Sequence, residues 1–294
     1  MSFYFIYRLK RTKMQKFINW VGCKKKLLPH LLPLIPKKFK TYYEPFLGSG
    51  ALYLSLMPKK AILNDNDTQL IQIWKSILYN PQDFYNKALA FENFIYQYPK
   101  SQQKQQKTAF ENLLKQYNHL LTKNKNRSTK ASLFFILSKY CFRGILRYKD
   151  NTSLYTTFGY KSKYKTSLLN LNDLFFLQKH FQKNKHLLLC TDYQKIIANA
   201  KKDDFVFIDP PYYNGKNITI SSFYKGVFGF TEQVKLFNCL EKADKSGAKW
   251  LYTNYDTPEI RALFKNYYFQ SIKSSTSHNL TNKNNNHEII ITNY

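Results

Sequence analysis

Seven short apolar runs decide the class of fold that this chain can adopt. Helical patterns accompany several of them: residues 51–56 follow the first run, and residues 231–245 precede the fifth. Such alternation is typical of a doubly wound α/β sheet. No helical pattern separates the last two runs, so we expect an antiparallel hairpin there, with the polar segment Ser277–His287 as its loop. The expected strands are Thr41–Tyr43, Ala61–Leu63, His186–Cys190, Phe205–Ile208, Lys249–Thr253, Tyr267–Ile272 and Glu288–Thr292.

About 120 residues separate the second and third runs, far more than a crossover connection needs. They show helical periodicity and no convincing buried strand, which indicates an insertion. We therefore expect one domain formed by residues 1–67 and 168–294, which contains the sheet. A second, mainly helical domain is expected at residues 68–167.

The charge of the chain is strongly unbalanced, with 46 Lys and Arg against 18 Asp and Glu, a net charge of +28. Residues 100–165 hold 15 of these basic residues and 2 of the acidic ones. Such an excess indicates a polyanionic partner, although an AT-rich genome would raise Lys and the aromatic residues as well. The basic residues are interleaved with Tyr and Phe, so nucleic acid is favoured over a membrane surface, and the insertion is the expected binding region.

Several classes of protein are disfavoured. No run of about eighteen apolar residues occurs, so no membrane-spanning helix is expected. The four cysteines lie far apart, without a C-x-x-C pair or clustered histidines, so neither a disulfide framework nor a metal site is expected. The N-terminal segment lacks the charge order and the cleavage site of a signal peptide. We expect a cytoplasmic protein, associated with the nucleoid through its DNA partner.

A glycine turn follows the first expected strand. Gly48 and Gly50 let the backbone and a ligand approach closely, since a Cβ would block both. The second expected strand leads into Asp65, where doubly wound folds bind ribose hydroxyls; Asp67 competes for this role, and a plain turn or helix cap is the alternative. No phosphate-binding glycine loop is present. A cofactor of the adenosine type without phosphates, such as S-adenosyl-L-methionine, therefore fits best, with Glu44 placed to attract its amino group.

The strongest motif is Asp209-Pro210-Pro211-Tyr212, directly after the apolar run Phe205–Ile208. The motif thus lies at the carboxyl edge of the expected sheet, where such folds hold their ligands. An adenine N6 is a poor nucleophile, because its lone pair is delocalised into the ring. The Asp209 carboxylate and the Pro210 carbonyl can accept its two N–H bonds and make it more nucleophilic, while Pro211 removes a competing N–H donor. Tyr212 can stack on a base flipped out of a duplex.

Four segments occur in a characteristic order: Phe17–Lys24, Glu44–Gly50, Asn64–Asp65 and, after the long insertion, Asp209–Tyr212. In this order they resemble the alpha-class, Dam-like adenine-specific DNA methyltransferases. The similarity covers Lys16 to Tyr294. It implies a Rossmann-like seven-stranded methyltransferase sheet with an inserted, mainly helical DNA-recognition domain, and double-stranded DNA as the partner.

The resemblance also assigns residues to the cofactor. It implies that Trp20 and Lys24 help to enclose S-adenosylmethionine and that Asp65 binds its ribose. Asp192 and Tyr193, after the third expected strand, would flank its adenine. The full expected cofactor-binding set is Trp20, Lys24, Glu44, Pro45, Phe46, Gly48, Gly50, Asp65, Asp192, Tyr193 and Asp209.

Within the insertion, the segments Ser138–Tyr148 and 158–161 are similar to the target-recognition hairpin of that family. Arg147 falls where the family uses an arginine on guanine, a contact with bidentate geometry; a phosphate contact is the alternative. Two departures bear on the target, because Arg143 and Thr157 occupy positions where members that read GATC commonly have Asn and Pro. Cys23 replaces the second glycine of the first motif. The expected DNA-binding residues are Lys139, Arg143, Arg147, Tyr148 and Lys161.

The resulting hypothesis is methyl transfer to adenine N6 in a short duplex site, GATC or a related sequence. The enzyme would act alone or with a cognate restriction endonuclease. Two alternatives stay open: methylation of adenine in RNA, since the chemistry at Asp209 is indifferent to the sugar, and an inactive DNA-binding module descended from a methyltransferase.

Overall fold

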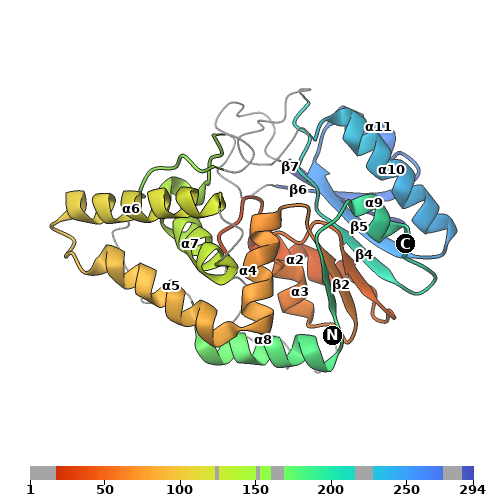
Figure 1. Cartoon of the computed structure of the whole chain (residues 1–294). Helices are drawn as coiled ribbons and strands as arrows, with labels where there is room; N and C mark the ends of the chain where they lie inside the picture. Colours follow the sequence, from red (N-terminus) through yellow and green to blue (C-terminus); the bar gives the residue numbers. More distant parts are fainter. Residues whose placement is uncertain (1–17, 123–125, 150–152, 160–168, 216–227, 274–286) are drawn as a thin grey trace. The chain divides into compact units, whose positions relative to one another are not determined.

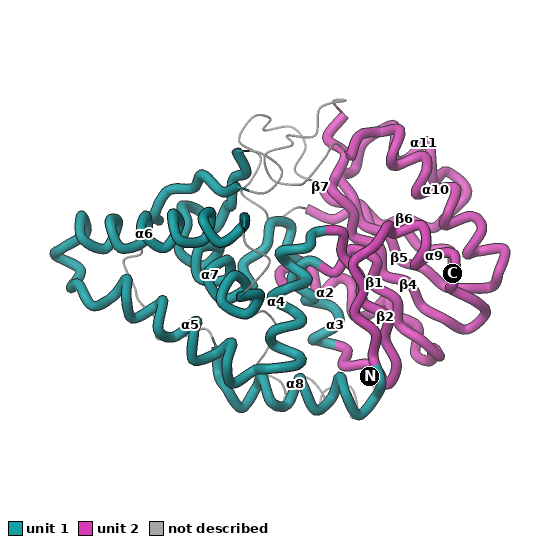
Figure 2. Tube along the Cα trace, in the orientation of Figure 1, with its two compact units in different colours: residues 1–23, 48–55, 67–185 teal, residues 24–47, 56–66, 186–294 magenta. Residues whose placement is uncertain are grey.

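The computed structural model describes residues 18–122, 126–149, 153–159, 169–215, 228–273 and 287–294. The chain forms two compact units (Figure 2). The sheet unit comprises residues 24–47, 56–66 and 186–294, and the helical unit comprises residues 1–23, 48–55 and 67–185.

The sheet unit contains one seven-stranded sheet among its described residues, in the order β3-β2-β1-β4-β5-β7-β6 (Figure 1). Neighbours from β3 to β5 are parallel, and β7 runs antiparallel to both β5 and β6. All seven expected strands and the final antiparallel pairing are confirmed; the segment 274–286 between β6 and β7 lies outside the described residues. The strands are β1 (Tyr42–Glu44), β2 (Ala61–Asn64), β3 (Leu187–Leu189), β4 (Phe205–Ile208), β5 (Lys249–Tyr255), β6 (Tyr268–Lys273) and β7 (His287–Thr292).

Alternate residues of β4, β5 and β7 build the core of the sheet unit, because successive side chains of a strand point to opposite faces. On one face they pack against α9 (Tyr193–Ile197), α10 (Phe230–Lys245) and α11 (Pro258–Leu263). Phe207 and Leu251, between them, are buried as well. Coverage of both faces explains why these strands read as continuous apolar runs. The alternating core residues are Val206, Ile208, Trp250, Tyr252, Ile289 and Ile291.

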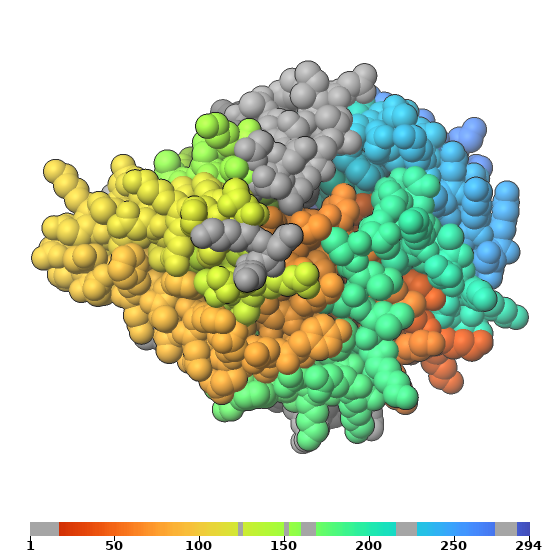
Figure 3. Space-filling model, in the orientation of Figure 1, coloured from red at the N-terminus to blue at the C-terminus, as the bar shows by residue number. Residues whose placement is uncertain are grey.

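The helical unit is organised around α7. Every residue of this helix from Ala131 to Tyr140 is buried, because α4, α5 and α6 all pack against it. The side chains of α5 and α6 form a continuous surface of this unit (Figure 3). The helices are α3 (Ala51–Leu56), α4 (Thr68–Tyr79), α5 (Pro81–Tyr96), α6 (Gln103–Leu121), α7 (Arg127–Tyr140), η3 (Phe142–Gly144) and α8 (Leu171–Lys183), while η1 (Lys24–Lys26), α2 (Leu28–Leu31) and η2 (Leu32–Leu34) belong to the sheet unit.

The helical unit is larger than the insertion expected at residues 68–167. Helix α8 belongs to it because its apolar side packs against α4 and α5; for example, the rings of Phe181 and Tyr79 lie 6.1 Å apart. Residues 48–55 join it as well, since the indole nitrogen of Trp74 donates to the Gly48 carbonyl over 3.1 Å. Segments that precede and follow residues 68–167 in the sequence therefore pack within the helical unit.

Candidate active site

Asp209 directly follows β4 and lies at the carboxyl edge of the parallel strands. One of its oxygens, Oδ1, lies 2.7 Å from the Lys24 ammonium and accepts a hydrogen bond of 2.8 Å from the Thr253 hydroxyl. The exposed fractions of the Lys24 and Asp209 side chains are 10% and 15%, so this ion pair is largely shielded from solvent. The resemblance assigns Lys24 to the cofactor, whereas the structure places its ammonium on the catalytic motif.

Two opposing effects set the protonation of Asp209. Burial raises the pKa of its carboxyl above the ordinary value, while the Lys24 ammonium and the Thr253 hydroxyl oppose that rise. The carboxyl of Glu288, on β7, adds to the rise. The pKa of Asp209 therefore depends on whether its lysine stays in place.

Tyr212 is held by its hydroxyl, which donates to Glu288 Oε2 over 3.0 Å. The Tyr255 ring meets it edge-on with centroids 4.9 Å apart, and the Lys24 ammonium lies 4.4 Å from its centroid. Burial raises the pKa of the Tyr212 phenol well above the ordinary value, so the hydroxyl stays a donor. The orientation of an aromatic ring beside Asp209 is thus determined from several sides.

Asn64 connects the turns that follow β1, β2 and β3. Its amide nitrogen donates to the carbonyls of Pro45 and Thr191, each over 3.0 Å, and its Oδ1 accepts from the Thr191 N–H over 3.0 Å. Its own carbonyl accepts from the Leu47 N–H over 2.8 Å. In the sequence Asn64 has no predicted role; its position at the end of an expected strand is the signal that could have indicated one.

The expected cofactor residues of the sheet unit lie in these same turns. Glu44 ends β1 with 2% of its surface exposed and accepts from the Tyr42 hydroxyl over 2.7 Å. Asp65 follows β2 and is partly exposed. Asp192 caps α9 by accepting from the Gln194 N–H over 2.7 Å. A carboxylate therefore ends or follows each of β1, β2 and β3, as Asp209 does for β4.

Phe46 and Tyr193 extend this set with apolar surface. Their ring centroids lie 5.1 Å apart, and the Phe228 ring contacts both. Phe46 follows β1 and Tyr193 begins α9, so two of the strand-end turns share one aromatic cluster. Flat aromatic surfaces at such an edge suit an adenine ring.

In the helical unit, the glycine turn has the backbone that only glycine adopts readily. Gly48 has φ +49° and Gly50 has φ +63°. A Cβ on Gly48 would lie 3.1 Å from Cδ1 of Trp20, so the indole packs directly on this turn. Asp67, the alternative ribose ligand, instead caps α4, because its Oδ1 accepts from the N–H groups of Gln69 and Leu70.

The resemblance assigns Gly48 to the S-adenosylmethionine site, and on that assignment replacing it with alanine is expected to weaken cofactor binding about tenfold, because the added methyl group strains the turn and displaces Trp20. Titration calorimetry measures this. Gly247→Ala is the matched control: its φ is +79° and its Cβ would lie 3.2 Å from Lys202 Cβ, at the end of α10. Equal losses of affinity in both variants would contradict a local role for the glycine turn.

Within the segments expected to form the recognition hairpin, Ser138–Tyr140 belong to α7, and residues 141–149 and 153–159 form an antiparallel hairpin. Cys141 pairs with Phe158 and Tyr148 with Leu154, both antiparallel. The Asn118 side chain of α6 both donates to and accepts from the backbone of Leu154, each bond being 2.9 Å. The hairpin is thus attached to the helices by a residue that sequence analysis did not single out.

Apart from Lys139, the expected DNA-binding residues divide into three groups. Arg143 and Arg147 are exposed, and Arg143 lies in the turn of η3 with φ +57°. Tyr148 is partly buried and donates to Asp67 Oδ2 over 3.3 Å. Lys161 lies outside the described residues.

The prediction for Lys139 is corrected by the structure. Its exposed fraction is 4%, and its ammonium pairs with the carboxylate of Glu92, which also accepts from the Tyr140 hydroxyl. A buried charge needs such a partner, because leaving it unpaired costs several kcal/mol. Lys139 is therefore a structural residue of the helical unit, and its place in a basic segment was misleading.

Gly159→Ala is expected to destabilise the hairpin by about 1–3 kcal/mol, because its Cβ would lie 2.8 Å from the Cys141 carbonyl oxygen and 2.9 Å from Phe142 Cα. Thermal unfolding and DNA affinity measure the effect, and both should fall. Gly144→Ala is the comparison for an added methyl group in open space: nothing lies within 4 Å of its Cβ, and its φ of +69° adds backbone strain that Gly159→Ala does not introduce. An unfolding temperature unchanged by Gly159→Ala would show that the close approach of Gly159 to the backbone of Cys141 and Phe142 is not needed for stability.

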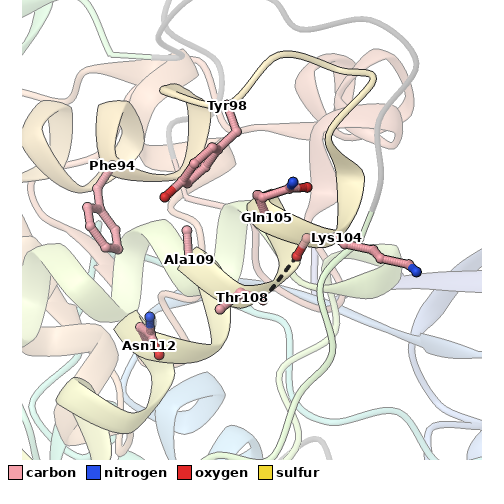
Figure 4. Close-up of a pocket in the computed structure, with 7 residues that line it drawn as sticks. All are labelled: Phe94, Tyr98, Lys104, Gln105, Thr108, Ala109 and Asn112. Atoms are coloured by element: carbon pink, nitrogen blue, oxygen red, sulfur yellow. Dashed lines mark hydrogen bonds between the residues drawn. The ribbon is translucent and has the colours of Figure 1, made fainter.

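Two cavities of the helical unit contain none of the expected site residues. One, of about 190 Å³, lies between α5 and α6 and is lined by Phe94, Tyr98 and Lys104 among others (Figure 4). The Thr108 hydroxyl, also in its wall, donates to the Lys104 carbonyl over 3.1 Å. The second, of about 330 Å³, includes Arg127 and Lys130 in its lining.

Two further observations concern the described residues only. They contain no group of three or more His, Cys, Asp or Glu side chains arranged to hold a metal ion. None of their helices is long and apolar enough to cross a membrane.

Comparison with known proteins places the chain among DNA methyltransferases. It is 25% identical over 288 residues to the type II methyltransferase M1.LlaDCHI of Lactococcus lactis subsp. cremoris, covering 97% of both chains. It is 26% identical to the DNA adenine methylase of Haemophilus influenzae, covering 91% of this chain and 88% of that protein. It is 24% identical to the type II methyltransferase M.MjaIII of Methanocaldococcus jannaschii, over 96% of this chain and the whole of that protein.

The family pattern of the D12 class N6 adenine-specific DNA methyltransferases matches residues 20–279. This match contains the strand-end turns, the helical insertion and the Asp209–Tyr212 motif. The chain therefore belongs to the D12 class N6 adenine-specific DNA methyltransferase family and is an adenine-specific DNA methyltransferase.

Proposed function

We propose that the protein transfers the methyl group of S-adenosylmethionine to N6 of an adenine that is flipped out of duplex DNA. The observation that carries this proposal is the environment of Asp209. Its carboxylate lies at the end of β4, paired with Lys24 and Thr253, beside the fixed ring of Tyr212. A flipped base is required because N6 cannot be reached inside the stacked duplex.

Asp209 and Pro210 activate the amine. The target amino group donates one N–H to the Asp209 carboxylate and the other to the Pro210 carbonyl, which none of the described residues hydrogen-bonds. The N6 lone pair is thereby withdrawn from the ring and directed at the electrophile. As the N6–C bond forms and the S–C bond of the methyl donor breaks, Asp209 would accept the proton that N6 loses.

The cofactor, when bound, supplies an electrophilic methyl group on a sulfonium. Glu44 attracts its amino group and Asp65 binds its ribose hydroxyls. Phe46 and Tyr193 provide the flat surface for its adenine. The buried carboxylate of Glu44 and the aromatic cluster support this assignment.

DNA recognition is assigned to the helical insertion. Arg143 and Arg147 are exposed on the hairpin and offer the guanidinium groups that bind guanine or phosphate. The net charge of residues 100–165 supports contact with the DNA backbone. We propose a short specific target, GATC or a related sequence, with Arg147 on guanine.

The names of the relatives suggest two biological settings. Two are type II methyltransferases and another is a DNA adenine methylase. We propose that the protein is the modification enzyme of a restriction system with a cognate endonuclease, or acts without one.

Sequencing of modified bases in DNA from cells that express the protein tests this function and yields the target sequence. N6-methyladenine at one short motif supports the proposal, and its absence from all sites opposes it. In vitro, transfer of labelled methyl groups to duplex DNA in competition with structured RNA separates the two acceptors. An inactive module would bind DNA but not S-adenosylmethionine, and calorimetry with the cofactor identifies it by the absence of binding.

A further inference from the structure

A chain of buried side chains holds the peptide groups on both sides of Tyr212. Gln233 of α10 donates from Nε2 to the Pro211 carbonyl over 2.9 Å. Asn254 of β5 accepts at Oδ1 from the Tyr213 N–H over 2.8 Å and from the Tyr255 N–H over 2.8 Å. Tyr252 lies between them in the chain of hydrogen bonds.

The direction of every hydrogen bond in this chain follows from chemistry. Because Asn254 Oδ1 accepts two backbone N–H groups, its Nδ2 must donate to the Tyr252 hydroxyl oxygen. The Tyr252 proton is then available for Gln233 Oε1, 2.8 Å away, which leaves Gln233 Nε2 for the Pro211 carbonyl. Each member thus determines the orientation of the next.

The burial of these groups makes the chain rigid. Gln233, Tyr252 and Asn254 have exposed fractions of 1%, 0% and 0%, so water cannot replace a lost partner. The two prolines already fix φ before Tyr212. With the Pro211 carbonyl and the Tyr213 N–H both engaged, the backbone at Tyr212 has little freedom to turn.

We propose that Gln233, Tyr252 and Asn254 are positioning residues for methyl transfer. They fix the Pro211 and Tyr213 peptide groups and thereby orient the Pro210 carbonyl and the Tyr212 ring. None of them is proposed to touch the base or the cofactor. The inference rests on the proposed function, in which Pro210 and Tyr212 contact the flipped adenine.

Tyr252→Phe removes the central hydroxyl and keeps the ring. We expect kcat for duplex DNA to fall about 10- to 100-fold, while the Kd for S-adenosylmethionine stays within about twofold. Tyr267→Phe is the control: its hydroxyl donates to Asp244 over 3.2 Å in the same sheet unit, outside this chain of bonds. Single-turnover rates, normalised to the cofactor-binding fraction, exclude a simple loss of folded protein.

Asn254→Asp provides a second variant that keeps the acceptor for both backbone N–H groups. The introduced carboxylate also accepts a hydrogen bond from the Tyr252 hydroxyl. The Gln233 side chain then keeps its hydrogen bond to either the Tyr252 hydroxyl or the Pro211 carbonyl and loses the other. We expect a fall in kcat similar to that of Tyr252→Phe, and a double variant no slower than either single one, since both act through one chain.

Rates within about twofold of wild type for both single variants would overturn the proposal, as would additive losses in the double variant. A wild-type enzyme that methylates no adenine in DNA would instead overturn the proposed function. The two failures are therefore distinguishable in one set of assays.

Discussion

Replacing Asp209 with asparagine is expected to lower kcat for methyl transfer about 100- to 1,000-fold. The amide keeps the shape and can still accept from Thr253, but it has no negative charge to polarise the N–H bond of the target amine. It is also a poor acceptor for the N6 proton. Labelled methyl transfer under single-turnover conditions measures the loss, and the Kd for DNA should change by no more than about twofold.

Asp203→Asn is the matched control for this substitution. Asp203 pairs with Lys40 over 3.0 Å in the same sheet unit, and the two side chains are 53% and 71% exposed, so the pair contributes little. Asparagine tolerates the positive φ of 70° at this position. Full activity in Asp209→Asn would rule out Asp209 as the group that activates the amine.

Replacing Lys24 with glutamine is expected to make methyl transfer sensitive to acid. Burial raises the pKa of Asp209 and Lys24 opposes the rise, so loss of Lys24 leaves the pKa higher. Only the ionised carboxylate accepts from the amine, and the ionised fraction falls as the pH drops through the pKa. The acid limb of the kcat/KM profile therefore moves to higher pH, and on that limb the variant is about tenfold slower than wild type.

At alkaline pH the two enzymes should converge, because Asp209 is ionised in both. The other groups that influence Asp209, namely Thr253 and Glu288, are unchanged in the variant. Lys40→Gln, which breaks the exposed pair with Asp203, should leave the profile in place. If Lys24 acted only on the cofactor, the variant would raise the Kd for S-adenosylmethionine and leave the acid limb unmoved.

The strands and the catalytic motif were predictable because both depend on local sequence. Continuous apolar residues marked the buried strands such as β4, and all seven strands, the antiparallel β6 and β7 included, were recognised within one or two residues at each end. Asp209–Tyr212 was recognisable since two prolines after such a strand end it abruptly. Connectivity alone then places the motif at the carboxyl edge of the sheet.

The partners of the motif were not predictable, because they come from distant parts of the chain. Thr253, Asn254 and Glu288 lie on β5 and β7, and their roles depend on the strand order. The sequence feature that points to a role for them beside the motif is their position near the ends of expected strands. Gln233 reads in sequence as an ordinary polar residue of a helix.

The roles of individual charged residues were the hardest to predict from the sequence. The sequence by itself determined the alternation of strands and helices, the glycine turn and the motif at Asp209, since each is encoded by neighbouring residues. Only the tertiary structure decided that Lys139 is buried against Glu92 and that Lys24 lies on Asp209. The physical reason is that the effect of a charge depends on burial and on its nearest partner, and both are set by residues remote in the chain.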